Sequence, residues 1–138
     1  MREILFRGKR VDNGEWVEGF YVNVPEHYKQ EMSGKSYIVS INNGLFMEVV
    51  PETVGEYTGM KGKNGKKIFE GDIIRTRGYY GKEIGVIRRG EYTVYSRYVF
   101  SGYYCEDKTS ALIEWTSSWS CEVIGTIHDN PELLEVKE

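Results

Sequence analysis

The sequence predicts a mainly β protein with two small, packed β subdomains, and three observations support this fold class. Sixteen glycines against three prolines indicate many tight turns in a chain of 138 residues. Asn-Gly pairs separate short runs of mixed apolar and polar residues, which is the pattern of β-hairpins. Aromatic residues make up 14% of the chain, with 11 Tyr and 3 Trp, so a few large side chains can supply the core.

The first subdomain is expected to cover residues 1–59 and to hold five short strands. Asp12-Asn13-Gly14 and Asn42-Asn43-Gly44 each predict a hairpin turn, because Asn and Gly accept the positive φ of such turns. Pro25 ends a strand, and the polar stretch that follows it predicts a loop. The expected strands are residues 4–11, 15–22, 37–41, 45–50 and 55–59, with an extended link at 51–54.

The second subdomain is expected to cover residues 60–138, and its number of strands with a terminal helix suggests a small SH3-like barrel. Glu70-Gly71-Asp72 and Gly90-Glu91 each predict a turn between two strands. Residues 101–110 have little pattern and are expected to form a long exposed loop. The expected strands are residues 68–69, 73–77, 83–89, 92–100, 111–115 and 121–127.

A short helix is expected near the end of the chain, starting at Pro131. Asn130 can cap the free backbone N–H groups, Pro131 suits the first turn, and Glu132 favours the positive end of the helix dipole. Only about two turns fit, so Leu133 and Leu134 must pack for the helix to persist.

The composition argues against a membrane protein and against a metalloprotein. No run approaches the roughly 20 apolar residues that a membrane helix needs, and no apolar signal segment opens the chain, so a cytoplasmic protein is expected. Cys105 and Cys121 are therefore expected to be reduced, and Cys121 to be a buried thiol. Together with His27 and His128 they lack metal-ligand spacing, so neither a metal nor a cofactor is predicted.

The charge distribution predicts a basic centre in an otherwise acidic chain. Residues 61–97 hold ten Lys or Arg and four Asp or Glu, a balance of +6, while the rest of the chain has a balance of −9. Such a region can bind nucleic acid, because cations contact phosphates and tyrosine rings stack on bases. Alternatively, the lysines only keep a hairpin loop hydrated. The candidate phosphate contacts are Lys61, Lys63, Lys66, Lys67, Arg75, Arg77, Arg88 and Arg89, and the candidate stacking rings are Tyr79, Tyr80, Tyr92, Tyr95 and Tyr98.

Aromatic residues in two short segments are candidates for contact with a protein partner. Trp115 and Trp119 surround a Thr-Ser-Ser turn, so both can enter the core, or one can mark an interaction surface. Tyr79 and Tyr80 lie in an aromatic tip between two glycines. Exposed edge strands make a homo-oligomer a further alternative.

No catalytic residue is predicted. The lysine-rich loop lacks the Gly-x-x-x-x-Gly-Lys-Ser/Thr spacing of a nucleotide-binding loop, and no Gly-x-Ser-x-Gly motif is present. Glu70 and Asp72 flank a glycine, and Asp72 is expected to accept backbone N–H bonds in that turn. His128 is expected to help fix the junction between the last strand and the helix.

Three separated segments resemble a known family. They are Tyr57-Thr-Gly with Lys63-Asn-Gly-Lys-Lys-Ile-Phe-Glu-Gly-Asp-Ile-Ile, the opening Arg2-Glu-Ile-Leu-Phe-Arg-Gly, and the closing Val123-Ile-Gly-Thr-Ile-His-Asp-Asn-Pro-Glu-Leu-Leu. In this order and at these distances they resemble the YopX-like family of phage and prophage proteins. The resemblance implies a β-rich fold and a phage or prophage origin, and it supplies no catalytic or binding residues.

Together these features predict a non-enzymatic accessory protein that binds a phage or host protein in the bacterial cytoplasm. A nucleic-acid-binding module that uses residues 61–97 is the alternative. An enzyme with a site between the two subdomains is a weaker alternative.

Overall fold

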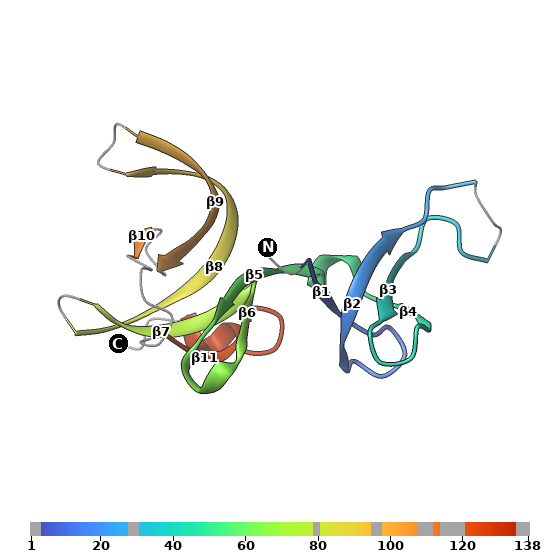
Figure 1. Cartoon of the computed structure of the whole chain (residues 1–138), viewed down its shortest axis with the longest axis horizontal. Coiled ribbons are helices and arrows are strands. Elements are labelled where there is room, and N and C mark those ends of the chain that lie inside the picture. The colour runs from blue at the N-terminus through green and yellow to red at the C-terminus, as the bar shows by residue number, and fades with distance from the viewer. Residues whose placement is uncertain are drawn as a thin grey trace. The chain divides into compact units, whose positions relative to one another are not determined.

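The computed structural model describes residues 4–27, 31–78, 81–94, 98–107, 112–113 and 121–134, and it confirms a mainly β fold (Figure 1). The strands form two antiparallel sheets. The chain divides into two compact units, Met1–Tyr57 and Thr58–Glu138, which we call the first and the second unit.

The first unit contains β1 to β4 and the start of β5, from the sheet whose strand order is β4-β3-β2-β1-β5-β6. Both predicted hairpins are confirmed, since β1 pairs with β2 and β3 pairs with β4. Strand β5 runs across the boundary between the units, and its first residues pair with β1. The link before β5 is a 3-10 turn, Pro51–Thr53, and not extended chain. The strands are β1 (Phe6–Lys9), β2 (Trp16–Asn23), β3 (Ser36–Ser40), β4 (Phe46–Glu48) and β5 (Gly55–Lys61).

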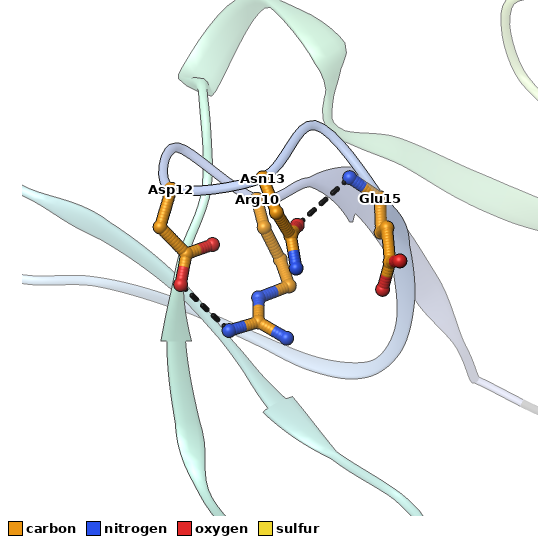
Figure 2. Close-up of polar contacts among 4 residues, drawn as sticks. All are labelled: Arg10, Asp12, Asn13 and Glu15. Atoms are coloured by element: carbon orange, nitrogen blue, oxygen red, sulfur yellow. Dashed lines mark hydrogen bonds and ion pairs between the residues drawn. The ribbon is translucent and has the colours of Figure 1, made fainter.

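The two hairpins use the same turn. In the first, Gly14 N donates to Arg10 O over 2.9 Å, Gly14 has a φ of 72°, and Asn13 Oδ1 accepts from Glu15 N (Figure 2). An ion pair of 2.7 Å between Arg10 and Asp12 closes this turn on one side (Figure 2). The second hairpin repeats the pattern at Ser40, Asn43, Gly44 and Leu45. The two hairpins of the first unit therefore share one turn geometry.

The outer strands of the two hairpins meet. Arg10 and Val49 form an isolated antiparallel bridge, and Val50 N donates to Lys9 O over 2.9 Å. The four strands therefore curl toward each other around a buried face that contains Ile38 and Val49, which are 0% and 1% exposed. Gly8 has no side chain there, and a Cβ on it would lie 3.1 Å from Val49 Cβ.

The second unit contains β6 and the sheet whose order is β10-β9-β8-β7-β11. In the described part of the chain this sheet is open, with β10 and β11 at its edges, so the SH3-like barrel is not confirmed. Its strands are β6 (Lys67–Phe69), β7 (Asp72–Gly78), β8 (Gly81–Val94), β9 (Tyr98–Asp107), β10 (Leu112–Ile113) and β11 (Cys121–Thr126).

Two loop predictions in this unit were wrong. No turn occurs at Gly90-Glu91, because β8 continues without interruption through Gly90 to Val94. The expected loop at residues 101–110 is strand β9 as far as Asp107. Gly90 pairs directly with Gly102. The pairing of β8 with β9 is continuous through both glycines, so the segment predicted as a turn and the start of the segment predicted as a loop lie within strands.

The core of this unit, which we call the cysteine core, is one cluster on a single face of the second sheet. It joins side chains of β6, β7, β8, β9 and β11, and Tyr103 and Val123 pack against it. Both cysteines are free and buried, which confirms the expectation for Cys121. The members of the cluster are Ile68, Ile74, Ile87, Cys105 and Cys121.

Where the terminal helix was expected to start, the described residues form a 3-10 turn, Pro131–Leu134. Asn130 does not cap it with its side chain, because Asn130 Oδ1 instead accepts from Thr126 N, 3.3 Å away. Thr126 Oγ1 in turn accepts from the backbone of His128 and Asp129. These hydrogen bonds hold the residues after β11 against the end of that strand. Leu133 is 36% exposed.

Candidate functional site

An exposed apolar row crosses three strands of the first unit. Phe20 on β2 lies directly opposite Val39 on β3, and Val39 lies opposite Phe46 on β4. Phe20 is 59% and Phe46 53% exposed, although both lie within regular strands. The Tyr37 ring supports the row, because it packs edge-on against Phe46 with centroids 6.0 Å apart. We call Phe20, Val39 and Phe46 the apolar row.

The alternation of side chains along a strand places the members of the apolar row on one face. Ile38 faces the buried side of the sheet, so its neighbours Tyr37 and Val39 face the other side. Phe20 and Phe46 share that other side through their register with Val39. Two further apolar residues, Ile41 and Leu45, flank the turn of the same hairpin and are 51% and 57% exposed.

Charged and aromatic side chains border the apolar row on the same side of the sheet. The Arg7 guanidinium lies 4.5 Å and the Lys9 ammonium 5.8 Å from the centroid of the Trp16 ring. Such cation–π contacts hold the long basic side chains over the ring. At the other end, Lys35 and Glu48 form an exposed ion pair of 3.8 Å. Charged side chains therefore lie on either side of the apolar row along the strands.

The predicted lysine candidates lie together on the turn between β5 and β6. Lys61 ends β5, Lys63 begins a 3-10 turn (Lys63–Gly65), and Lys66 precedes β6; all three are exposed, and Lys67 is half-buried. Gly62 N donates to Lys66 O over 2.7 Å and closes the turn. A Cβ on Gly62 would lie 2.8 Å from Cys121 O, so this lysine turn rests against the start of β11.

The predicted arginine candidates lie on two faces of the second sheet. Arg89 is exposed beside the cysteine core, and its guanidinium lies 5.9 Å from the centroid of the Tyr103 ring. Arg75 and Arg88 occupy alternate positions relative to Ile74 and Ile87 and therefore face the opposite side. Ile68 of the cysteine core follows the lysine turn directly, and Arg89 lies on the cysteine-core side of the sheet, whereas Arg75 and Arg88 lie on the other side.

Several predicted residues cannot be placed in a site. Tyr79, Tyr80, Tyr95, Trp115 and Trp119 lie outside the described residues. Arg77 lies in β7 and Tyr98 in β9, and the description covers only their backbone.

The carboxylate of Asp72 stabilises the turn between β6 and β7. It is 0% exposed, and its Oδ2 accepts from Phe69 N over 2.8 Å, which confirms the predicted turn role. Gly71 has a φ of 91°, and the His128 ring is close to it, with Nε2 3.4 Å from where a Cβ would lie. His128 thus packs against the turn before β7 as well as following β11.

The described residues contain neither a metal-binding cluster nor a membrane-spanning helix. No group of three or more His, Cys, Asp or Glu residues is placed to hold a metal ion within this part of the chain. None of the helices described here has the length and apolar character to span a membrane.

The comparisons with known proteins identify a family. The crystal structure of protein EF1440 from Enterococcus faecalis is similar over 98% of this chain and 100% of that chain, with 22% sequence identity and a TM-score of 0.46. No curated protein matches the sequence significantly. The model of the YopX protein family matches residues 5–135, which is nearly the whole chain. This chain therefore belongs to the YopX protein family.

Proposed function

We propose that this member of the YopX family is a non-enzymatic phage or prophage accessory protein that binds a protein partner through the apolar row. The observation that carries the proposal is the exposure of Phe20 and Phe46 on either side of Val39. Large contiguous apolar patches with polar residues at their margin mark interaction sites, and aromatic side chains are enriched at the centres of protein interfaces.

The surroundings of the row also favour a protein partner. A typical interface has an apolar centre that loses its water and a polar rim that stays wet. Phe20 and Phe46 supply such a centre, and the Lys35–Glu48 ion pair lies at its margin. The contact between Tyr37 and Phe46 holds one ring in place before binding, which lowers the entropy lost on association.

The test compares variants of the row with a matched surface variant. A partner captured from the bacterial host or from phage-producing cells is purified, and its affinity is measured by isothermal titration calorimetry. Phe20→Ser and Phe46→Ser should each weaken binding about tenfold or more, since a buried interface aromatic contributes about 2 kcal/mol. Val11→Ser is the control, because Val11 is also exposed, at 53%, but lies in the turn after β1. Equal affinity for all variants would contradict the proposal.

A second candidate function is the binding of single-stranded nucleic acid by the second unit. The specific observation in its favour is that the lysine turn and Arg89 border the same cysteine core, with the Tyr103 ring beside Arg89. Cations and an aromatic ring on one side of a sheet suit a phosphate backbone and its bases.

Salt dependence tests this candidate. If the lysine turn contacts phosphates, fluorescently labelled single-stranded DNA should bind at about 50 mM salt, and affinity should fall steeply as salt rises. Lys63→Ala combined with Lys66→Ala should reduce the slope of log K against log salt by about 2. Arg88→Ala is the control on the opposite face and should leave the slope unchanged. Absence of binding at about 50 mM salt would exclude this function.

A further inference from the structure

The β8–β9 hairpin extends beyond the strands that flank it (Figure 1). Strand β7 pairs with β8 only as far as Val86, and β10 pairs with β9 only at Cys105 and Glu106. Beyond that point, the described residues of β8 and β9 pair only with each other. An isolated two-stranded ribbon is marginally stable in water, so its conformation depends on contacts within the ribbon. We call residues 91–94 and 98–101 the arm.

Two glycines face each other where the arm begins. Gly90 and Gly102 are paired in register, and their φ angles are +150° and +147°. L-residues with a side chain are strongly disfavoured in this region of backbone conformation. A Cβ at either position would meet no atom within 4 Å, so lack of space does not explain the glycines. It is the backbone conformation of the paired strands that requires them.

A ring contact spans this glycine pair. Tyr92 lies two residues beyond Gly90 in the arm, whereas Tyr104 lies two residues from Gly102 on the side of the sheet. The two-residue period of a strand places both rings on one face, and their centroids are 5.2 Å apart with planes inclined by 37°. The contact therefore joins the arm to the body of the hairpin across the point where neither strand has a side chain.

We propose that Gly90 and Gly102 form a hinge and that the Tyr92–Tyr104 contact is the latch that holds the arm in the position described here. With the rings apart, the ribbon loses a contact between the arm and the body of the hairpin, and the glycine pair permits backbone conformations that residues with a side chain disfavour. A molecule that binds either ring better in one position therefore shifts the population of the arm. This device lies in the second unit and does not depend on the apolar row.

Distance measurements between spin labels test the latch in the full chain. Labels at Val99→Cys, in the arm, and Glu122→Cys, on β11, occupy two exposed positions within the second unit. Because Cys105 and Cys121 are buried, the unsubstituted protein serves as the labelling control. The latch predicts one narrow distance distribution, which Tyr92→Ala or Tyr104→Ala broadens or shifts. Ser101→Ala, beside the hinge but without a ring, should leave it narrow.

Hydrogen exchange separates release of the arm from unfolding of the sheet. In Tyr92→Ala the amides of residues 91–94 and 98–101 should exchange up to about tenfold faster, while those of β7 keep their protection. Gly90→Ala should move the arm to a new distance even with both tyrosines present. The proposal is overturned if the tyrosine variants keep the distance distribution and the exchange rates of the unsubstituted protein.

Discussion

Gly19→Ala is expected to destabilise the first unit by about 3 kcal/mol or more, the largest effect of any substitution considered for this protein. Gly19 lies in the middle of β2, between β1 and β3, and a Cβ there would overlap the carbonyl oxygen of Val39. A backbone carbonyl in a ladder cannot move aside as a flexible side chain can. The whole β2–β3 pairing must shift, which also displaces the apolar row.

Urea unfolding with hydrogen exchange on the β2 and β3 amides measures this effect and assigns it to the first unit. Gly14→Ala is the matched control. Gly14 has a φ of 72° but open space around it, so only the conformational cost of about 1 kcal/mol is expected. A loss at Gly19→Ala no larger than at Gly14→Ala would show that β2 and β3 are less closely paired than described here.

Asp72→Ala is expected to destabilise the second unit by about 2–3 kcal/mol. The carboxylate is fully buried, and removing it leaves the Phe69 N–H without the acceptor that it has at 2.8 Å. A buried N–H without a partner is costly, because water cannot replace the lost oxygen. This bond also connects β6 to β7 across the Gly71 turn, so Ile68 in the cysteine core should lose order as well.

Asp72→Asn is the informative companion variant, because its side-chain oxygen can still accept from Phe69 N. It should recover part of the stability and keep the Phe69 amide protected from exchange. Thermal unfolding and amide exchange together measure both variants. If Asp72→Ala costs less than about 0.5 kcal/mol, the carboxylate does not hold the turn.

The sequence predicted local structure correctly where the conformation of a short segment depends only on residues within that segment. Asn13-Gly14 and Asn43-Gly44 predicted their hairpins, because the turn needs only a glycine with positive φ and an Asn oxygen for a nearby N–H. Asp72 was likewise predicted from the glycine beside it. In each case the atoms that make the bond lie within a few residues of each other.

The sequence predicted local structure wrongly where the conformation of a segment depends on hydrogen bonds to another segment. Gly90 carries a turn signal, but its pairing with Gly102 keeps it within a strand. Asn130 is a good helix cap by sequence, yet the N–H of Thr126 uses its side-chain oxygen instead. The SH3-like barrel, inferred from the number of strands, a glycine-marked turn and a terminal helix, stays unconfirmed, because these features do not determine whether the edges β10 and β11 pair.

The candidate site was the least predictable part. Phe20 was not recognised as exposed, because β2 has apolar residues on both faces, with Phe20 and Val22 on one and Val17 and Tyr21 on the other. The two-residue period separates the faces but does not reveal which one is buried. In the same way, the position of Arg89, and not Arg88, on the side of the cysteine core depends on which face of β8 contributes to that core.

The central claim is that the apolar row is a protein-binding surface, and photocrosslinking in bacterial cells that contain the partner tests it most directly. The photoreactive residue p-benzoylphenylalanine replaces Phe20, Phe46 or the control Val11, all of which are exposed. The account predicts a specific protein adduct from the Phe20 and Phe46 positions and none from Val11. An adduct pattern that is the same at all three positions, or no adduct at Phe20 and Phe46, would contradict it.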